Sequence, residues 1–163
     1  MAMLEKKTRV LVADDDQAIR QLVCTIVKRE GLEVDCAADG AEAIEMLREH
    51  EYAVLLIDLM MPRVDGFGVI EYVKNHPAPQ KPVVLVITAY ADQKFKEVDP
   101  AIVAGVLRKP FEVADLGNLV RLCVHGFDNM AQPSRLPESD VVLRNLAVRT
   151  WDAAHEGNGN GAH

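Results

Sequence analysis

Apolar residues gather into five short runs along the chain, and the stretches between the runs carry apolar residues at helical spacing. The runs are rich in valine, leucine and isoleucine, which is typical of strands that are buried on both faces of a parallel sheet. We expect strands at residues 9–13, 32–37, 53–57, 83–87 and 105–108. The second run is the most mixed of the five, which favours a place nearer an edge of the sheet.

Apolar residues three and four positions apart predict amphipathic helices between the strands. The first helix is expected to stop at Gly31, the second to open with a capping box at Asp39, and the third to span about 67–75. The segment 91–104 is largely polar and contains Pro100, so only a short, poorly anchored helix is expected there. A last helix is predicted from one apolar stripe: Val113, Leu116, Val120, Cys123, Val124 and Phe127.

Strands that alternate with helices predict an α/β fold, in which right-handed crossovers build one parallel sheet covered on both faces. The length of 163 residues suits one well-cored domain with an appendage. We expect the domain over residues 1–127, a linker at 128–136 and an additional amphipathic helix at 137–156. The glycine- and asparagine-rich residues 157–163 are predicted to be disordered.

The overall charge and hydropathy narrow the class of protein. A net charge of -7 argues against a broad nucleic-acid surface, which would need a basic patch. No apolar run approaches the roughly 18–20 residues that cross a bilayer, and the first residues lack the apolar core of a signal peptide. The sequence therefore predicts a cytoplasmic protein that binds neither nucleic acid nor membrane.

The chain has three cysteines, Cys24, Cys36 and Cys123, which are widely spaced and lie in apolar segments. An odd number at such spacing favours buried hydrophobic residues over a disulfide or a metal site. We expect all three to be small buried hydrophobic residues.

Polar residues stand where four of the predicted strands end. Asp14 and Asp15 follow the first run, and Asp58 follows the third. Thr88 closes the fourth run, and Lys109 ends the fifth. Ligands of open parallel sheets bind in the crevice beyond the carboxyl ends of the strands. We therefore expect these five side chains to surround one site.

These residue types suit a metal and phosphoryl site. Adjacent carboxylates are hard oxygen ligands of the kind that Mg²⁺ takes, but Asp14 and Asp15 point to opposite sides if both continue the strand. One of the two should then dominate. Asp58 can serve as a ligand and as a nucleophile toward phosphorus. Thr88 offers a hydroxyl donor for a phosphoryl oxygen, and Lys109 offers a positive charge for a phosphate or for Asp58.

Each of these residues taken alone also has a purely structural explanation. An aspartate that follows a strand is more often a helix cap or a turn residue. Asp16 is expected to cap the first helix in this way, and Asp65-Gly66 is expected to form a turn. Only the presence of all five residues at the same end of the predicted sheet indicates a metal and phosphoryl site.

Together these residues resemble the receiver domain of two-component response regulators, in its single-domain, chemotaxis-regulator-like form. The matching motifs are Asp14-Asp15, Asp58 in Asp-x-Met-Met-Pro-x-x-Asp-Gly, Thr88-Ala89 and Lys109-Pro110-Phe111, and the likeness covers about residues 8–127. The resemblance implies a five-stranded, doubly wound, flavodoxin-like sheet of order 2-1-3-4-5, here with an extra C-terminal helix.

The resemblance also implies roles at the acceptor site. Asp58 accepts a phosphoryl group from a phosphohistidine on a sensor histidine kinase or a histidine phosphotransfer protein. Asp15 binds Mg²⁺ directly, Asp14 helps mainly through water, and the carbonyl of Met60 is a further ligand. Lys109 binds the phosphoryl group. The only enzyme-like steps implied are self-phosphorylation from a phosphodonor and autodephosphorylation.

A second set of residues is implied to switch or tune the domain. Thr88 binds a phosphoryl oxygen and shifts on activation, and Pro110 follows a cis peptide. Met60 and Tyr90 flank the approach of the hydrolytic water. The family often has an aromatic residue three positions before the lysine, and Val106 stands there in this chain. Our hypothesis is that phosphorylation loosens or reorders 91–104, with Thr88 as the trigger.

No effector domain is expected after residue 127, so the predicted output is a contact with a downstream target protein. The apolar stripe centred on Leu146 and Trp151 could pack on its own domain, form a homodimer or bind that partner.

Three other functions share parts of this pattern. A phosphatase of the haloacid dehalogenase type wants Asp-x-Asp at its nucleophile, and Met60 stands at the second position here. A flavodoxin-like cofactor binder needs a phosphate-cradling loop after the first strand, where this chain has three aspartates. A pseudo-receiver that binds proteins without phosphorylation is disfavoured because the acceptor-site residues are all present.

Overall fold

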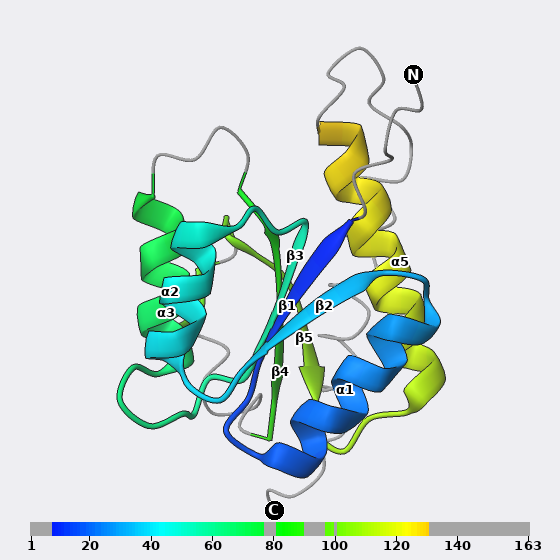
Figure 1. Cartoon of the computed structure of the whole chain (residues 1–163), viewed down its shortest axis with the longest axis horizontal. Coiled ribbons are helices and arrows are strands. Elements are labelled where there is room, and N and C mark those ends of the chain that lie inside the picture. Colours follow the sequence, from blue (N-terminus) through cyan, green and yellow to red (C-terminus); the bar gives the residue numbers. More distant parts are fainter. Residues whose placement is uncertain (1–7, 77–80, 90–96, 100, 131–163) are drawn as a thin grey trace, which may run out of the picture.

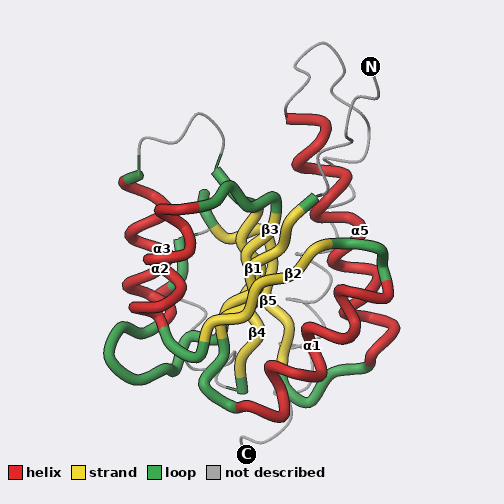
Figure 2. The backbone as a smooth tube through the Cα atoms, in the orientation of Figure 1, coloured by secondary structure: helices red, strands yellow, loops and turns green. Residues whose placement is uncertain are grey.

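The computed structural model describes residues 8–76, 81–89, 97–99 and 101–130. Strands and helices alternate along these residues (Figures 1 and 2). The strands are β1 (Arg9–Ala13), β2 (Glu33–Ala37), β3 (Val54–Ile57), β4 (Val83–Thr88) and β5 (Val103–Arg108). The helices are α1 (Gln17–Arg29), α2 (Gly40–Glu49), α3 (Gly66–Asn75) and α5 (Val113–Met130).

All five strands are parallel and lie in the order β2-β1-β3-β4-β5, which confirms the predicted α/β fold and strand order. Helices α1 and α5 cover one face of the sheet, and α2 and α3 cover the other (Figure 1). β2 is an edge strand and is the least buried of the first three strands, as its mixed sequence predicted.

Alternate residues of the central strands enter two separate cores, because side chains of a strand point to opposite faces. Val10 and Val12 join the core beneath α1 and α5. Leu11 and Ala13 join the core beneath α2 and α3. β3 repeats the pattern and is buried along its whole length, which explains why these segments read as unbroken apolar runs.

Aspartate side chains begin three of the helices. Asp16 accepts a hydrogen bond from the Ile19 backbone N–H at the start of α1, as predicted. At the start of α2, the Asp39 side chain accepts a hydrogen bond from the Glu42 backbone N–H. The Glu42 side chain in turn accepts from the backbone N–H of Ala38, which completes a capping box. Asp65, expected in a turn, caps α3 instead.

The predicted strands β2, β3 and β4 differ from the structure by one residue at one end, and two other predicted boundaries differ by more. β5 begins at Val103, so the last two residues of the segment predicted as a short helix (91–104) belong to the sheet. α5 continues to Met130, three residues into the predicted linker. The rest of that linker, the additional helix at 137–156 and the tail at 157–163 lie outside the described residues. Across the residues described, none of the helices has the length and apolarity of a bilayer-crossing segment.

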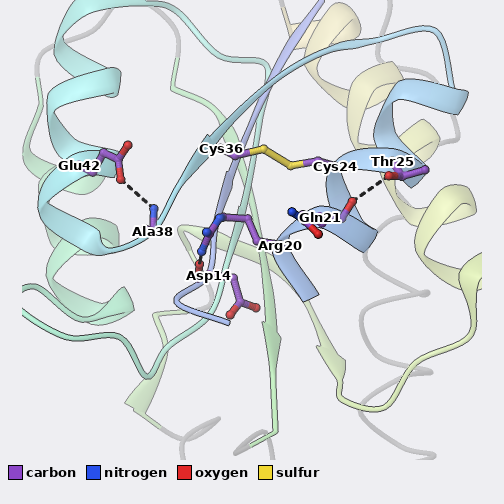
Figure 3. The surroundings of a disulfide bond; sticks show 8 residues. All are labelled: Asp14, Arg20, Gln21, Cys24, Thr25, Cys36, Ala38 and Glu42. Carbon is purple, nitrogen blue, oxygen red and sulfur yellow. Dashed lines mark hydrogen bonds between the residues drawn. A yellow bond between two sulfur atoms is a disulfide. The ribbon is translucent and has the colours of Figure 1, made fainter. Parts of the chain in front are cut away.

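Cys24 and Cys36 form a disulfide between α1 and β2 (Figure 3), so the prediction that both are plain buried hydrophobic residues was wrong. Their Cα atoms lie 7.1 Å apart although 12 positions separate them in the chain. The chain turns at Gly31, whose φ is 78°, and β2 then runs back beside α1. Cys123 is a free, buried thiol, as predicted, and burial raises its pKa to about 12.

Breaking the Cys24–Cys36 bond is expected to lower the free energy of unfolding by about 2–3 kcal/mol, because a cross-link over this spacing restricts the unfolded chain. Denaturant unfolding with and without dithiothreitol measures the change. The variant with Cys24→Ala and Cys36→Ala serves as the control and should not respond to the reductant. Equal midpoints for the oxidised and reduced parent would contradict the expectation.

Candidate functional site

The carboxyl ends of β1, β3 and β5 bring three of the predicted site residues together. Lys109 donates from Nζ to Oδ2 of Asp14 at 2.6 Å and to Oδ2 of Asp58 at 2.9 Å. Asp14, Asp15 and Asp58 each place a carboxylate oxygen within 4.8 Å of the others, so the three could hold a metal ion. The sheet thus gathers side chains that are up to 95 positions apart in the chain.

The backbone of Asp14 is held from two sides. Its N–H donates to the carbonyl of Ala37 at the end of β2, at 3.2 Å. Its carbonyl accepts from Nη1 of Arg20 at 2.7 Å, a contact drawn in Figure 3. Sequence reasoning missed Arg20, although a long side chain one turn beyond the Asp16 cap is placed to reach back over the strand end.

The backbone around Asp58, at the end of β3, is held just as closely. The Asp58 N–H donates to the carbonyl of Ala13 at 3.0 Å, and Oδ1 of Asp58 accepts from the Met60 N–H at 3.2 Å. A Cβ on Gly66 would lie 2.4 Å from the Asp58 carbonyl oxygen, so this position needs glycine for the close approach. The Gly66 N–H donates to the carbonyl of Leu59 at 2.9 Å and closes the loop.

Burial and charge are unusual at this site. Asp14 and Asp58 are buried, Lys109 is largely buried, and Asp15 is exposed. Burial raises the pKa of Asp14, although Lys109 and the Asp16 N–H act in the opposite direction. Burial also disfavours the charged form of Lys109, but hydrogen bonds to both carboxylates outweigh it and raise its pKa. One ammonium facing three carboxylates leaves a negative excess that a divalent cation would balance.

Thr88 and Pro110 complete the described part of the site. Thr88 is the fully buried last residue of β4, and its carbonyl accepts from the Lys109 N–H at 3.0 Å. The peptide between Lys109 and Pro110 is cis, as the resemblance implied. The hydrogen bond to Thr88 ties the backbone of Lys109 to the end of β4.

The residues predicted to switch or tune the domain have fewer described contacts with the site than Asp14, Asp58 and Lys109 have. Met60 as a whole is 43% exposed, although its backbone N–H donates to Oδ1 of Asp58. Val106 is half-buried and packs against the core beneath α2 and α3. Tyr90, residues 91–96 and Pro100 lie outside the described residues. The roles predicted for Tyr90 and for the segment 91–104 therefore stay predictions.

Comparison with known sequences identifies the family of the chain. Residues 10–121 match the family described as the response regulator receiver domain. A probable transcriptional regulator, ycf27, of Porphyridium aerugineum is 29% identical over 139 residues, which is 84% of this chain. The chain spans only 56% of the length of that relative.

Two solved structures share the fold. The chemotaxis response regulator CheY4 of Vibrio cholerae is 28% identical, with a TM-score of 0.66 over 72% of this chain and 99% of that one. The response regulator TrrA of Thermotoga maritima, solved in complex with Mg²⁺ and BeF, is 26% identical. Its TM-score is 0.63 over 71% of this chain and 98% of that one. The chain described here belongs to the response regulator receiver domain family.

Proposed function

We propose that this chain is a phosphoryl-accepting response regulator and that Asp58 is the acceptor. The phosphoryl group would come from a phosphohistidine on a sensor histidine kinase or a histidine phosphotransfer protein. The observation that carries the proposal is the pair of contacts from Lys109 to Asp14 and Asp58 beside the exposed Asp15. A purely structural ion pair would not need a third carboxylate at the same strand ends.

The transfer itself needs an oxygen nucleophile and a way to offset negative charge. A carboxylate oxygen of Asp58 attacks phosphorus, the bond from phosphorus to the histidine nitrogen breaks, and the imidazole leaves with that electron pair. Lys109 already donates to Asp58 and is placed to donate to an incoming phosphoryl oxygen. Thr88, at the end of the neighbouring strand, supplies a hydroxyl.

The donor set suits Mg²⁺, which favours oxygen ligands and usually keeps several waters. Asp15, Asp58 and the backbone carbonyl of Met60 would hold the ion, with Asp14 assisting through water. When bound, Mg²⁺ would offset the repulsion between the carboxylate and an anionic phosphoryl donor. The Mg²⁺ complex of the similar Thermotoga maritima regulator supports this choice of metal.

The output is proposed to be a contact with a downstream target protein that changes when Asp58 carries the phosphoryl group. Self-association of the phosphorylated chain is one form such a contact could take. The chain is proposed to turn over no external substrate beyond its own phosphorylation and dephosphorylation, and to act in the cytoplasm. Met60 has no carboxylate to serve as the acid of a haloacid dehalogenase-type phosphatase.

Incubation with acetyl phosphate and Mg²⁺ is expected to add one phosphoryl group to the chain, seen as an increase in intact mass. Excess chelator should abolish the gain, because the carboxylates would then repel the donor. A generic phosphoester gives the control and should not be hydrolysed repeatedly. A folded parent whose mass stays unchanged with Mg²⁺ and donor would overturn the proposed function.

A further inference from the structure

Arg63 is the one non-glycine residue with a positive φ in the part of the chain that the structure describes. Its φ of 65° is left-handed backbone, which is disfavoured for residues that carry a Cβ. The residue lies in the loop between Asp58 and α3. Such a conformation persists only where the surroundings impose it, and it often marks a functional segment.

The Arg63 side chain is held by Asp39, the residue that caps α2. Its guanidinium donates from Nε to Oδ2 of Asp39 at 2.9 Å, and Nη2 donates to the same oxygen. The Asp39 side chain is only 8% exposed, and its other oxygen caps α2 through the Glu42 N–H. This hydrogen bond and Arg63 hold the pKa of Asp39 below its usual value, so the carboxylate is charged at neutral pH.

A second contact presses the same loop against α2. The Gly40 N–H donates to the carbonyl of Val64 at 3.0 Å. A Cβ on Gly40 would lie 2.1 Å from that carbonyl oxygen, so the loop backbone lies directly against the first turn of α2. The outer end of the loop is therefore tied to a helix that does not contribute a site residue.

The inner end of the loop carries the site. The Met60 N–H contacts Oδ1 of Asp58, and the loop closes where the Gly66 N–H donates to Leu59. Arg63 and Met60 therefore lie in the same short loop, which is closed by the contact between Gly66 and Leu59. The carbonyl proposed as a metal ligand belongs to this stretch.

We propose that Arg63 and Asp39 are positioning residues for the metal site: their ion pair holds the loop in the backbone conformation that aims the Met60 carbonyl. This inference rests on the proposed function. Neither residue touches the metal or the phosphoryl group, and each acts through the loop. Groups that orient metal ligands from outside typically change metal affinity by about tenfold or more when removed.

The variant Arg63→Gly distinguishes an effect on Mg²⁺ affinity from an effect on the stability of the fold. Glycine tolerates the positive φ but does not hold it. Because the Arg63 side chain is 67% exposed, losing its ion pair is expected to lower the melting temperature of the variant only slightly. Its dissociation constant for Mg²⁺, measured by titration calorimetry with the metal alone, is expected to rise about tenfold. The rate of phosphorylation by acetyl phosphate should fall at low Mg²⁺ and return to within about twofold of the parent at saturating Mg²⁺.

Three further variants complete the test. Asp39→Asn keeps the helix cap, because asparagine caps as well as aspartate, and should weaken Mg²⁺ binding as Arg63→Gly does. The variant with both changes should be no weaker than either single variant, since the two residues act as one pair. Arg121→Gln removes an arginine that is ion-paired with Glu30, the residue that follows α1, and should leave Mg²⁺ binding unchanged.

The outcomes separate the two proposals. A parent that binds Mg²⁺ and accepts the phosphoryl group, with an Arg63→Gly variant of equal Mg²⁺ affinity, would overturn the positioning role and leave the proposed function standing. A lower melting temperature with an unchanged Mg²⁺ dependence would overturn it as well. A parent that neither binds Mg²⁺ nor gains mass would overturn both.

Discussion

Asp58→Asn is expected to give a folded chain that gains no phosphoryl group from acetyl phosphate and Mg²⁺. The amide oxygen of asparagine is a poor nucleophile and carries no charge for the metal. The substitution also removes one of three neighbouring carboxylates while Lys109 keeps its contact with Asp14 at 2.6 Å. The free energy of unfolding should therefore stay unchanged or rise, which denaturant unfolding will show beside the intact mass.

Asp65→Asn is a matched control for this result. It makes the same chemical change in the same loop, where Asp65 caps α3 through the Gly68 N–H. Asparagine caps equally well, so both stability and phosphorylation should match the parent. Equal mass gain in Asp58→Asn and the parent would mean that another residue is the acceptor.

Lys109→Met should have the largest effect on stability, at about 3–5 kcal/mol near neutral pH. Methionine keeps an apolar stem of similar length, but two buried carboxylates then face each other without a cation. Phosphorylation should also fall sharply, because no ammonium remains to meet the phosphoryl oxygens. Unfolding in denaturant and the rate of mass gain measure the two effects.

The loss of stability in Lys109→Met should depend on pH. In the parent, the raised pKa of Lys109 means that its stabilising contribution is fully present below about pH 10.5 and is lost only above it. The pKa of Asp14 is already raised by burial, so its contribution to stability falls as pH rises through its folded-state pKa. Removing Lys109 raises that pKa further. The deficit should therefore be larger at about pH 8 than at about pH 5.

Two comparisons make the Lys109→Met result decisive. Added Mg²⁺ should restore part of the lost stability, because it supplies the missing positive charge. Lys74→Met removes an exposed lysine that pairs with Asp99 at 3.1 Å and should change little, because exposed ion pairs contribute little. A deficit that is the same at both pH values would argue against charge as the cause.

The sequence predicted the parts of the fold that rest on burial. β1 and β3 were predicted from sequence because both faces of these strands are covered, so all their residues except Arg9, at the start of β1, are apolar. The grouping of the aspartates with Lys109 followed from the predicted strands, because parallel strands place their carboxyl ends at one end of the sheet. Asp14, Asp58 and Lys109 are therefore found in contact, as expected.

The contacts that the sequence did not reveal join elements whose spacing depends on three-dimensional packing. The Cys24–Cys36 bond forms because β2 returns beside α1, and no local pattern reports that distance. The pair of Arg63 with Asp39 joins two loops 24 positions apart, and Arg63 falls at a position that the acceptor motif leaves open. The early start of β5 was missed because a proline and polar residues precede it.

The direction of α5 has a consequence for how such a chain can be joined to other proteins. The helix starts shortly after Lys109, at the carboxyl ends of the strands, and runs back toward their amino ends (Figure 1). Its 18 residues correspond to about 27 Å. A domain fused directly behind Met130 would thus be attached near the amino ends of the strands, away from Asp58 and the proposed site of phosphoryl transfer. This layout permits output modules to be exchanged in evolution or by engineering without altering the phosphorylation chemistry.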